Sequence, residues 1–261
     1  PFAELWRSPP TLGRMLETSL GVAAYLITVI ALVAITAKSL ELYRRIKAGQ
    51  ADPTRNSDKG KRFSLMVREV LTHAKMLNFT GSGIAHWFVM IGFVSLFGTL
   101  VTAYGQILDP HFVLPLIGHF VPYNLFVELI TWLTGISIVA LIAIRQVTRF
   151  TKKGRASRFF GSGSWKAYFV EATILAIVFC VIALRGLEGA LIGYSGNPWD
   201  FALSKPAVNA FADLDTATLE KWIVIVAALK IIISMTWFIV IAANLTMGVA
   251  WHRFLAPFNI F

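Results

Sequence analysis

The sequence has a single cysteine, Cys180, in 261 residues. One thiol cannot form an intramolecular disulfide, and there is no cysteine cluster to hold an iron–sulfur cluster or a structural zinc ion. A small apolar filler within a helix is the simplest interpretation of Cys180. The residue count therefore excludes an intramolecular disulfide and a metal centre built from several cysteines within this stretch of chain.

Charged residues are also scarce. They make up 15% of the chain, whereas a soluble domain carries about 25%. Hydrophobic residues account for 56% and the mean hydropathy is +0.67. Several apolar runs exceed the roughly 18 residues that mark a membrane-spanning helix. The composition predicts an all-α integral membrane protein that crosses the lipid bilayer several times.

The net charge of +10 raises the question of a nucleic-acid partner. Lysine and arginine concentrate in two segments, residues 44–62 and 145–158. That placement follows the positive-inside rule for membrane proteins, whereas a nucleic-acid-binding protein presents a basic surface on a soluble domain. We therefore expect both segments on the cytoplasmic side and no nucleic-acid partner.

The apolar runs and the basic segments together predict the topology. A five-span helical bundle places the N-terminus outside and the C-terminus in the cytoplasm, with residues 1–261 as one domain. An amphipathic helix at 62–79 is expected on the inner membrane surface before span two. Thr216 or Thr218 is expected to cap the last helix. The predicted spans are 16–40, 83–104, 123–144, 167–184 and 218–251.

Two histidines fall at the cytoplasmic ends of predicted spans. His86 lies one turn inside span two, and His252 lies at the end of span five. An ionisable side chain at membrane depth is costly and indicates a functional site. Two imidazoles from facing helices can bind the iron of one b-type haem from opposite sides. Alternatively, His86 only donates a hydrogen bond to a carbonyl between packed helices.

Neighbouring residues fit this hypothesis without proving it. Gly83 and Gly248 lie on the same helical faces as His86 and His252, where a porphyrin would need side-chain-free surface. Glycine also serves ordinary helix packing in membranes. Arg253 is a candidate partner for a haem propionate, although a basic side chain extending to the interface explains it equally well.

A third histidine, His73, lies in the predicted amphipathic helix. A solvated histidine at the membrane interface is the favoured interpretation. His73 nevertheless remains an alternative or additional ligand of the haem iron.

The residues around the two main histidines resemble a known family. The pattern Gly83-x-x-His86, followed by residues 91–93 (IGF) and 98–100 (GTL), resembles the second helix of the haem b membrane subunits of respiratory nitrate reductase and heterodisulfide reductase. Residues 252–259 (HRFLAPFN) resemble the exit from their last helix. The layout is closer still to the N-terminal membrane domain of actinobacterial iron–sulfur-binding reductases.

The resemblance implies an electron-transfer role in fatty acid oxidation at a bacterial plasma membrane. Electrons from a reduced electron-transfer flavoprotein would pass through 4Fe–4S clusters of a cytoplasmic domain expected after residue 261. They would continue through haem b to menaquinone, making the protein a quinone-linked oxidoreductase. The two-haem members of the family have two further histidines where this chain has Leu96 and Ser234, so one haem is expected.

The quinone site is less defined by sequence. Quinone reduction needs proton donors beside an apolar slot, and Glu128, Lys230 and Tyr168 are the candidates. Glu128 and Lys230 could instead form a structural ion pair. Two alternative functions stay open: a haem-free membrane anchor or assembly subunit, and a small transporter, for which an internal repeat would be expected.

Overall fold

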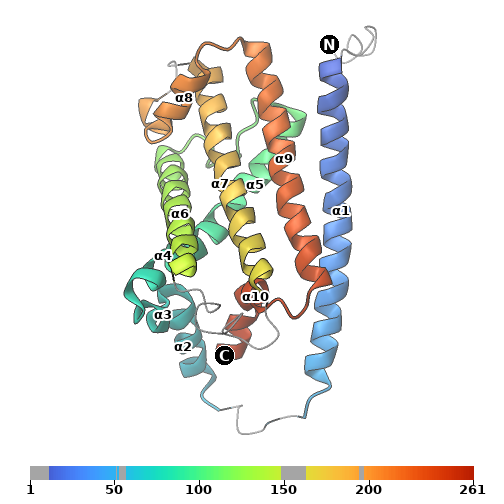
Figure 1. Cartoon of the computed structure of the whole chain (residues 1–261), viewed down its shortest axis with the longest axis vertical. Helices are drawn as coiled ribbons and strands as arrows, with labels where there is room; N and C mark the ends of the chain where they lie inside the picture. Colours follow the sequence, from blue (N-terminus) through green and yellow to red (C-terminus); the bar gives the residue numbers. More distant parts are fainter. Residues whose placement is uncertain (1–11, 51, 53–56, 148–162, 194–196) are drawn as a thin grey trace. The chain divides into compact units, whose positions relative to one another are not determined.

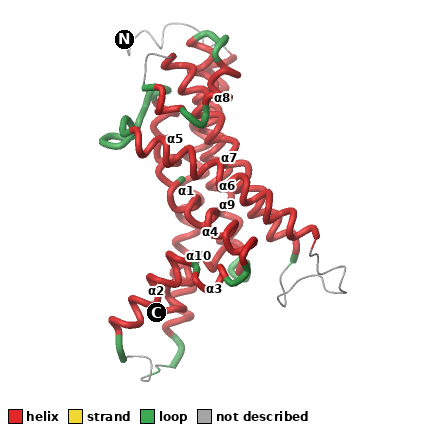
Figure 2. Tube along the Cα trace, turned by 90° about the vertical axis from the view of Figure 1, so that its left-hand side faces the viewer, coloured by secondary structure: helices red, strands yellow, loops and turns green. Residues whose placement is uncertain are grey.

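The computed structural model describes residues 12–50, 52, 57–147, 163–193 and 197–261. Helices and turns make up this part of the chain, which contains no β-strand (Figures 1 and 2). Most of the second basic segment, residues 148–158, lies outside the described ranges. The helices are α1 (Leu12–Lys47), α2 (Lys59–Thr72), α3 (Ala74–Leu77), α4 (Thr80–Ser95), α5 (Phe97–Leu108), α6 (Val121–Val147), α7 (Ser164–Ile192), η5 (Pro198–Phe201), α8 (Lys205–Phe211), α9 (Thr216–Ala243) and α10 (Gly248–Ile260).

Five segments of the described chain are long and apolar enough to cross a membrane: α1, the α4–α5 pair, α6, α7 and α9. The prediction of a helical chain with five helices long and apolar enough to cross a membrane is confirmed for the described residues. The second of them is interrupted at Leu96, which belongs to neither α4 nor α5. Most helices extend beyond their predicted bounds because polar residues at the ends continue the helical hydrogen bonding.

The predicted amphipathic helix is divided at His73. Helix α2 ends at Thr72, and α3 begins at Ala74. His73 adopts a left-handed conformation with φ 50°, which non-glycine residues rarely adopt. This conformation ends the first helix because it cannot continue a right-handed helix. No residue of α2 is buried, and its Phe63 and Leu65 are exposed. This exposed apolar surface is typical of a helix that lies on a membrane.

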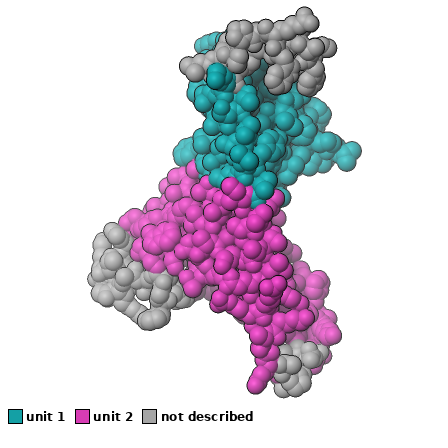
Figure 3. All heavy atoms as spheres, turned by 90° about the vertical axis from the view of Figure 1, so that its right-hand side faces the viewer, with its two compact units in different colours: residues 1–29, 95–131, 179–234 teal, residues 30–94, 132–178, 235–261 magenta. Residues whose placement is uncertain are grey.

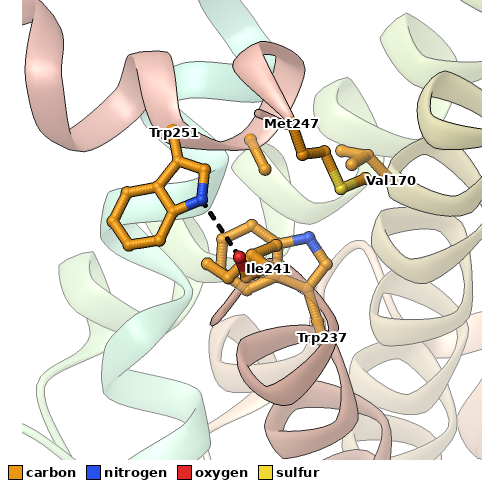
Figure 4. Packing of buried hydrophobic residues seen from close by; sticks show 6 residues of the cluster. Val170, Trp237, Ile241, Met247 and Trp251 are labelled. Atoms are coloured by element: carbon orange, nitrogen blue, oxygen red, sulfur yellow. Dashed lines mark hydrogen bonds between the residues drawn. The ribbon is translucent and has the colours of Figure 1, made fainter. Parts of the chain in front are cut away.

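The last predicted span, 218–251, was wrong at its C-terminal end. Helix α9 ends at Ala243 and a separate helix, α10, carries His252. Two side chains donate to carbonyls in the last turn of α9. The Trp251 indole donates to Ile241 O at 3.0 Å, an oxygen that also accepts from Asn244 N–H at 3.1 Å, and the Asn244 amide donates to Val240 O at 2.8 Å. Figure 4 shows the Trp251 bond beside Met247. Because these carbonyls have partners, the chain can turn here at little cost.

The expected cap of α9 was also wrong. Asp215, rather than Thr216 or Thr218, supplies the capping side chain: its carboxylate accepts hydrogen bonds from Thr218 N–H at 3.0 Å and from Thr218 Oγ1 at 2.7 Å. These bonds, the hydroxyl bond foremost, lower the pKa of Asp215. A carboxylate is the stronger acceptor and its charge is favoured at a helix N-terminus.

The described chain forms two compact units (Figure 3). Unit 1 comprises residues 1–29, 95–131 and 179–234, and unit 2 comprises residues 30–94, 132–178 and 235–261. Their limits fall within α1, α4, α6, α7 and α9. The histidines 73, 86 and 252 belong to unit 2, whereas Glu128 and Lys230 belong to unit 1.

Gly83 allows a close approach within unit 2. A Cβ atom at this position would lie 2.2 Å from the carbonyl oxygen of Met76 and 3.1 Å from Leu77 Cα. The glycine is therefore needed where α4 packs against the backbone of α3. A Cβ at Gly248 would meet no atom within 4 Å, so that position leaves open space beside its helix.

We expect Gly83→Ala to destabilise the protein by about 1–3 kcal/mol, because the added methyl overlaps backbone that cannot rotate away. Gly81→Ala is the matched control on the same helix, since its Cβ would meet nothing within 4 Å. Thermal unfolding in detergent, followed by circular dichroism, measures the difference. Equal melting temperatures for the two variants would contradict the packing assigned to Gly83.

Candidate functional site

Three histidine side chains lie next to one another in unit 2. His73 comes from the turn between α2 and α3, His86 from α4, and His252 from α10. The ring centroids of His73 and His86 are 5.3 Å apart, and those of His86 and His252 are 5.9 Å apart. The structure thus places His86 and His252, the two predicted ligands, beside each other. His73, the third candidate, is the other neighbour of His86.

Two of these rings have their Nδ1 atoms engaged. Nδ1 of His252 lies 3.1 Å from Gly248 O, and Nδ1 of His73 lies 2.8 Å from Val70 O. A carbonyl can only accept, so Nδ1 carries the hydrogen in both neutral rings and Nε2 keeps its lone pair. This is the tautomer in which Nε2 is able to bind a metal ion.

His86 differs because its polar atoms are not fully paired. The residue is half-buried, and its Nδ1 is buried without a hydrogen-bond partner among the described residues. An unpaired buried polar atom costs about 1–3 kcal/mol. Such an atom calls for an explanation, and a ligand or a small movement of the adjacent His73 ring would supply one.

The spacing of the His86 and His252 rings bears on whether they could bind a haem iron between them. Metal–nitrogen bonds of about 2 Å on both sides of an iron place two imidazole centroids about 6 Å apart, close to the 5.9 Å between His86 and His252. The described residues contain no group of three or more histidine, cysteine or acidic side chains arranged to hold a metal ion. Haem does not need one, because the porphyrin supplies the other four donors. The separation of the two rings is compatible with two imidazoles on one iron.

A cation adjoins the pair. The Arg253 guanidinium lies 4.7 Å from the centroid of the Phe93 ring and 5.6 Å from that of Trp237. Burial lowers the pKa of Arg253 to about 10, so the group stays charged at neutral pH. His252 keeps an exposed surface, yet desolvation and then the Arg253 charge lower its pKa. A neutral imidazole, the form that binds metals, is therefore favoured.

The aromatic residues under Arg253 were not anticipated from the sequence. Phe93 packs against Trp237 with centroids 5.7 Å apart and against Phe254 at 6.4 Å. Trp237 belongs to the buried core of Figure 4. The only available signal was the adjacency of Arg253 to His252, since nothing in a single sequence pairs α4 with α9 and α10.

The quinone candidates do not form one cluster. Tyr168 belongs to unit 2, where its hydroxyl accepts a hydrogen bond from Gln146 at 3.0 Å. In unit 1, Glu128 accepts from Leu203 N–H at 2.8 Å and lies 3.5 Å from Arg185. Lys230 bonds instead to Thr99, so it forms no direct ion pair with Glu128.

Leu96 and Ser234 are both buried, with Ser234 donating to Lys230 O at 2.8 Å. Neither side chain is an imidazole, and the hydroxyl is already used within its own helix.

Comparisons of the chain with protein-family models, with curated proteins and with solved structures give no match. The function is therefore argued from the residues and their geometry.

Proposed function

We propose that the protein is a membrane electron-transfer module that binds one haem b between His86 and His252. The observation that supports this most directly is the juxtaposition of the two imidazoles at 5.9 Å. The unpartnered Nδ1 of His86 and the free Nε2 of His252 add to it. Haem supplies reversible one-electron transfer when bound.

Each residue of the cluster then has a definite role. His86 and His252 would each hold the iron through a nitrogen lone pair. Gly248 O orients the His252 ring, and the His73 ring lies beside His86 at 5.3 Å between centroids. Arg253 adds a fixed positive charge that favours the reduced iron and attracts propionates.

The remainder of the pathway follows the family resemblance. By that resemblance, a reduced electron-transfer flavoprotein would be the electron donor and menaquinone the acceptor. The two basic segments support an orientation with the N-terminus outside and the C-terminus in the cytoplasm. In that orientation the histidine cluster lies toward the cytoplasmic side, where a cytoplasmic donor would reach it.

The ligand pair predicts about one haem per chain. Purified protein should show a b-type reduced-minus-oxidised spectrum, quantified as the pyridine haemochrome. His86→Ala and His252→Ala should each abolish it, because one imidazole cannot replace two axial ligands.

His119→Ala is the matched control, since His119 is an exposed loop residue. His73→Ala should retain the haem with a shifted potential. Haem that survives both ligand substitutions, or is lost on His73→Ala alone, would contradict the assignment. No haem in any preparation would favour the membrane-anchor alternative.

Arg253 predicts a shift in redox potential. Arg253→Leu should lower the haem midpoint potential by an amount on the order of tens of millivolts, because a nearby positive charge stabilises the reduced iron. Arg253→Lys keeps the charge and should retain most of the potential. Spectroelectrochemical titration of both variants measures the effect. An unchanged potential in Arg253→Leu would place the guanidinium away from the iron.

Menaquinone is expected to oxidise the reduced haem. In proteoliposomes under anaerobic conditions, a short-chain menaquinone should accelerate haem reoxidation at least about tenfold, equivalent to ~1.4 kcal/mol in the barrier. The corresponding menaquinol, which has no electrons to accept, is the control. Equal rates with both compounds would refute quinone reduction and leave the haem proposal standing.

A further inference from the structure

Unit 1 contains a small polar cavity that the proposed function does not use. Its volume is about 60 Å³. Polar side chains from four helices line it, among otherwise apolar surroundings. They are Thr99, Thr102 and Gln106 of α5, Tyr123 and Asn124 of α6, Arg185 and Glu188 of α7, and Lys230 of α9.

Lys230 is the most unusual member of this lining. Its side chain is 1% exposed, and its ammonium donates to Thr99 O at 2.7 Å and to Thr99 Oγ1 at 2.8 Å. An ammonium has three hydrogens, and the described residues supply no third acceptor and no carboxylate within ion-pair distance. A buried charge left in that state is costly.

The opposite side of the lining carries spare acceptors. Glu188 receives Gln106 Nε2 at 2.5 Å and Arg185 at 3.1 Å, and its oxygens still have lone pairs free. Gln106 is 1% exposed, yet its Oε1 has no partner among the described residues, and neither does the buried Tyr123 hydroxyl. One donor and several acceptors therefore border the same space without contacting one another.

The size and lining of the cavity indicate what occupies it. One water needs about 10–15 Å³ of such space, so the cavity has room for several waters. A bare ion fits poorly, since donors and acceptors of both signs are present, whereas water satisfies both kinds.

We propose that this cavity is a hydrated proton-transfer site in which water links the Lys230 ammonium to the Glu188 carboxylate. A proton leaves Lys230 Nζ for the oxygen of the bridging water as another proton of that water moves to a Glu188 oxygen. The products are a neutral amine, a neutral carboxylic acid and the same number of waters, and the reverse step restores the ammonium and the carboxylate. Arg185, Glu128, Tyr123 and Cys180 are the other titratable groups beside these two.

The proposal involves residues of unit 1 alone and does not depend on the haem. Infrared difference spectroscopy of the full chain in lipid nanodiscs, recorded across a pH titration, tests it. Wild-type protein should show a band of weakly bonded internal water and a protonated-carboxyl C=O band. Lys230→Met should lose the water band, and Glu188→Gln should lose the carboxyl band.

Lys221→Met is the matched control, because Lys221 lies on the same helix at a more exposed position, and both bands should persist in it. Should Lys230→Met fail to fold, Thr99→Val removes one acceptor of the ammonium and should shift the water band. A high-resolution cryo-electron microscopy map of the wild-type chain gives a second readout, with density expected between Lys230 Nζ and Glu188. Bands unchanged by Lys230→Met or Thr99→Val, or a cavity without density, would overturn the proposal.

Discussion

The end of α9 depends on two side-chain hydrogen bonds. In an apolar surrounding, the carbonyls that a helix leaves free must find donors, because no solvent replaces them at low cost. Trp251 and Asn244 provide these donors to Ile241 O and Val240 O. The bond from Trp251 also ties α10, the helix that carries His252 and Arg253, to the end of α9.

The same requirement organises the polar residues of unit 1. Glu128 Oε2 accepts from a backbone N–H, and the carboxylate lies 3.5 Å from Arg185, although Glu128 Oε1 and Arg185 Nε have no hydrogen-bond partner among the described residues. Arg185 also donates to Asp200 O. Lys230 is satisfied in part by Thr99. A fully paired group stabilises a fold at modest net gain, whereas a partly paired one is costly. The incompletely paired atoms, at His86 and around Lys230, are therefore the most informative about ligands.

The sequence was sufficient for features that depend on long, periodic patterns. Run length gave the five apolar helices, and span direction brought His86 and His252 to similar depth. It was insufficient where one side chain decides the outcome. Trp251 reaches back ten residues to end α9, Asp215 replaces a threonine as the cap, and Gly83 serves a contact with Met76. None of these contacts has a periodic signal, because each depends on tertiary placement.

The position of His73 indicates which histidines of the cluster have a structural role and which are the proposed ligands. Its Nδ1 bond to Val70 O and its left-handed backbone already explain it as the residue that ends α2. Moving it toward an iron would disturb α3, which packs on Gly83. Leaving it in place keeps its ring 5.3 Å, centroid to centroid, from the ring of His86. Metal-bound histidines commonly donate their second N–H to a neighbouring acceptor, which fixes ring orientation and raises ligand basicity. A structural His73 is therefore consistent with the proposed ligand role of His86.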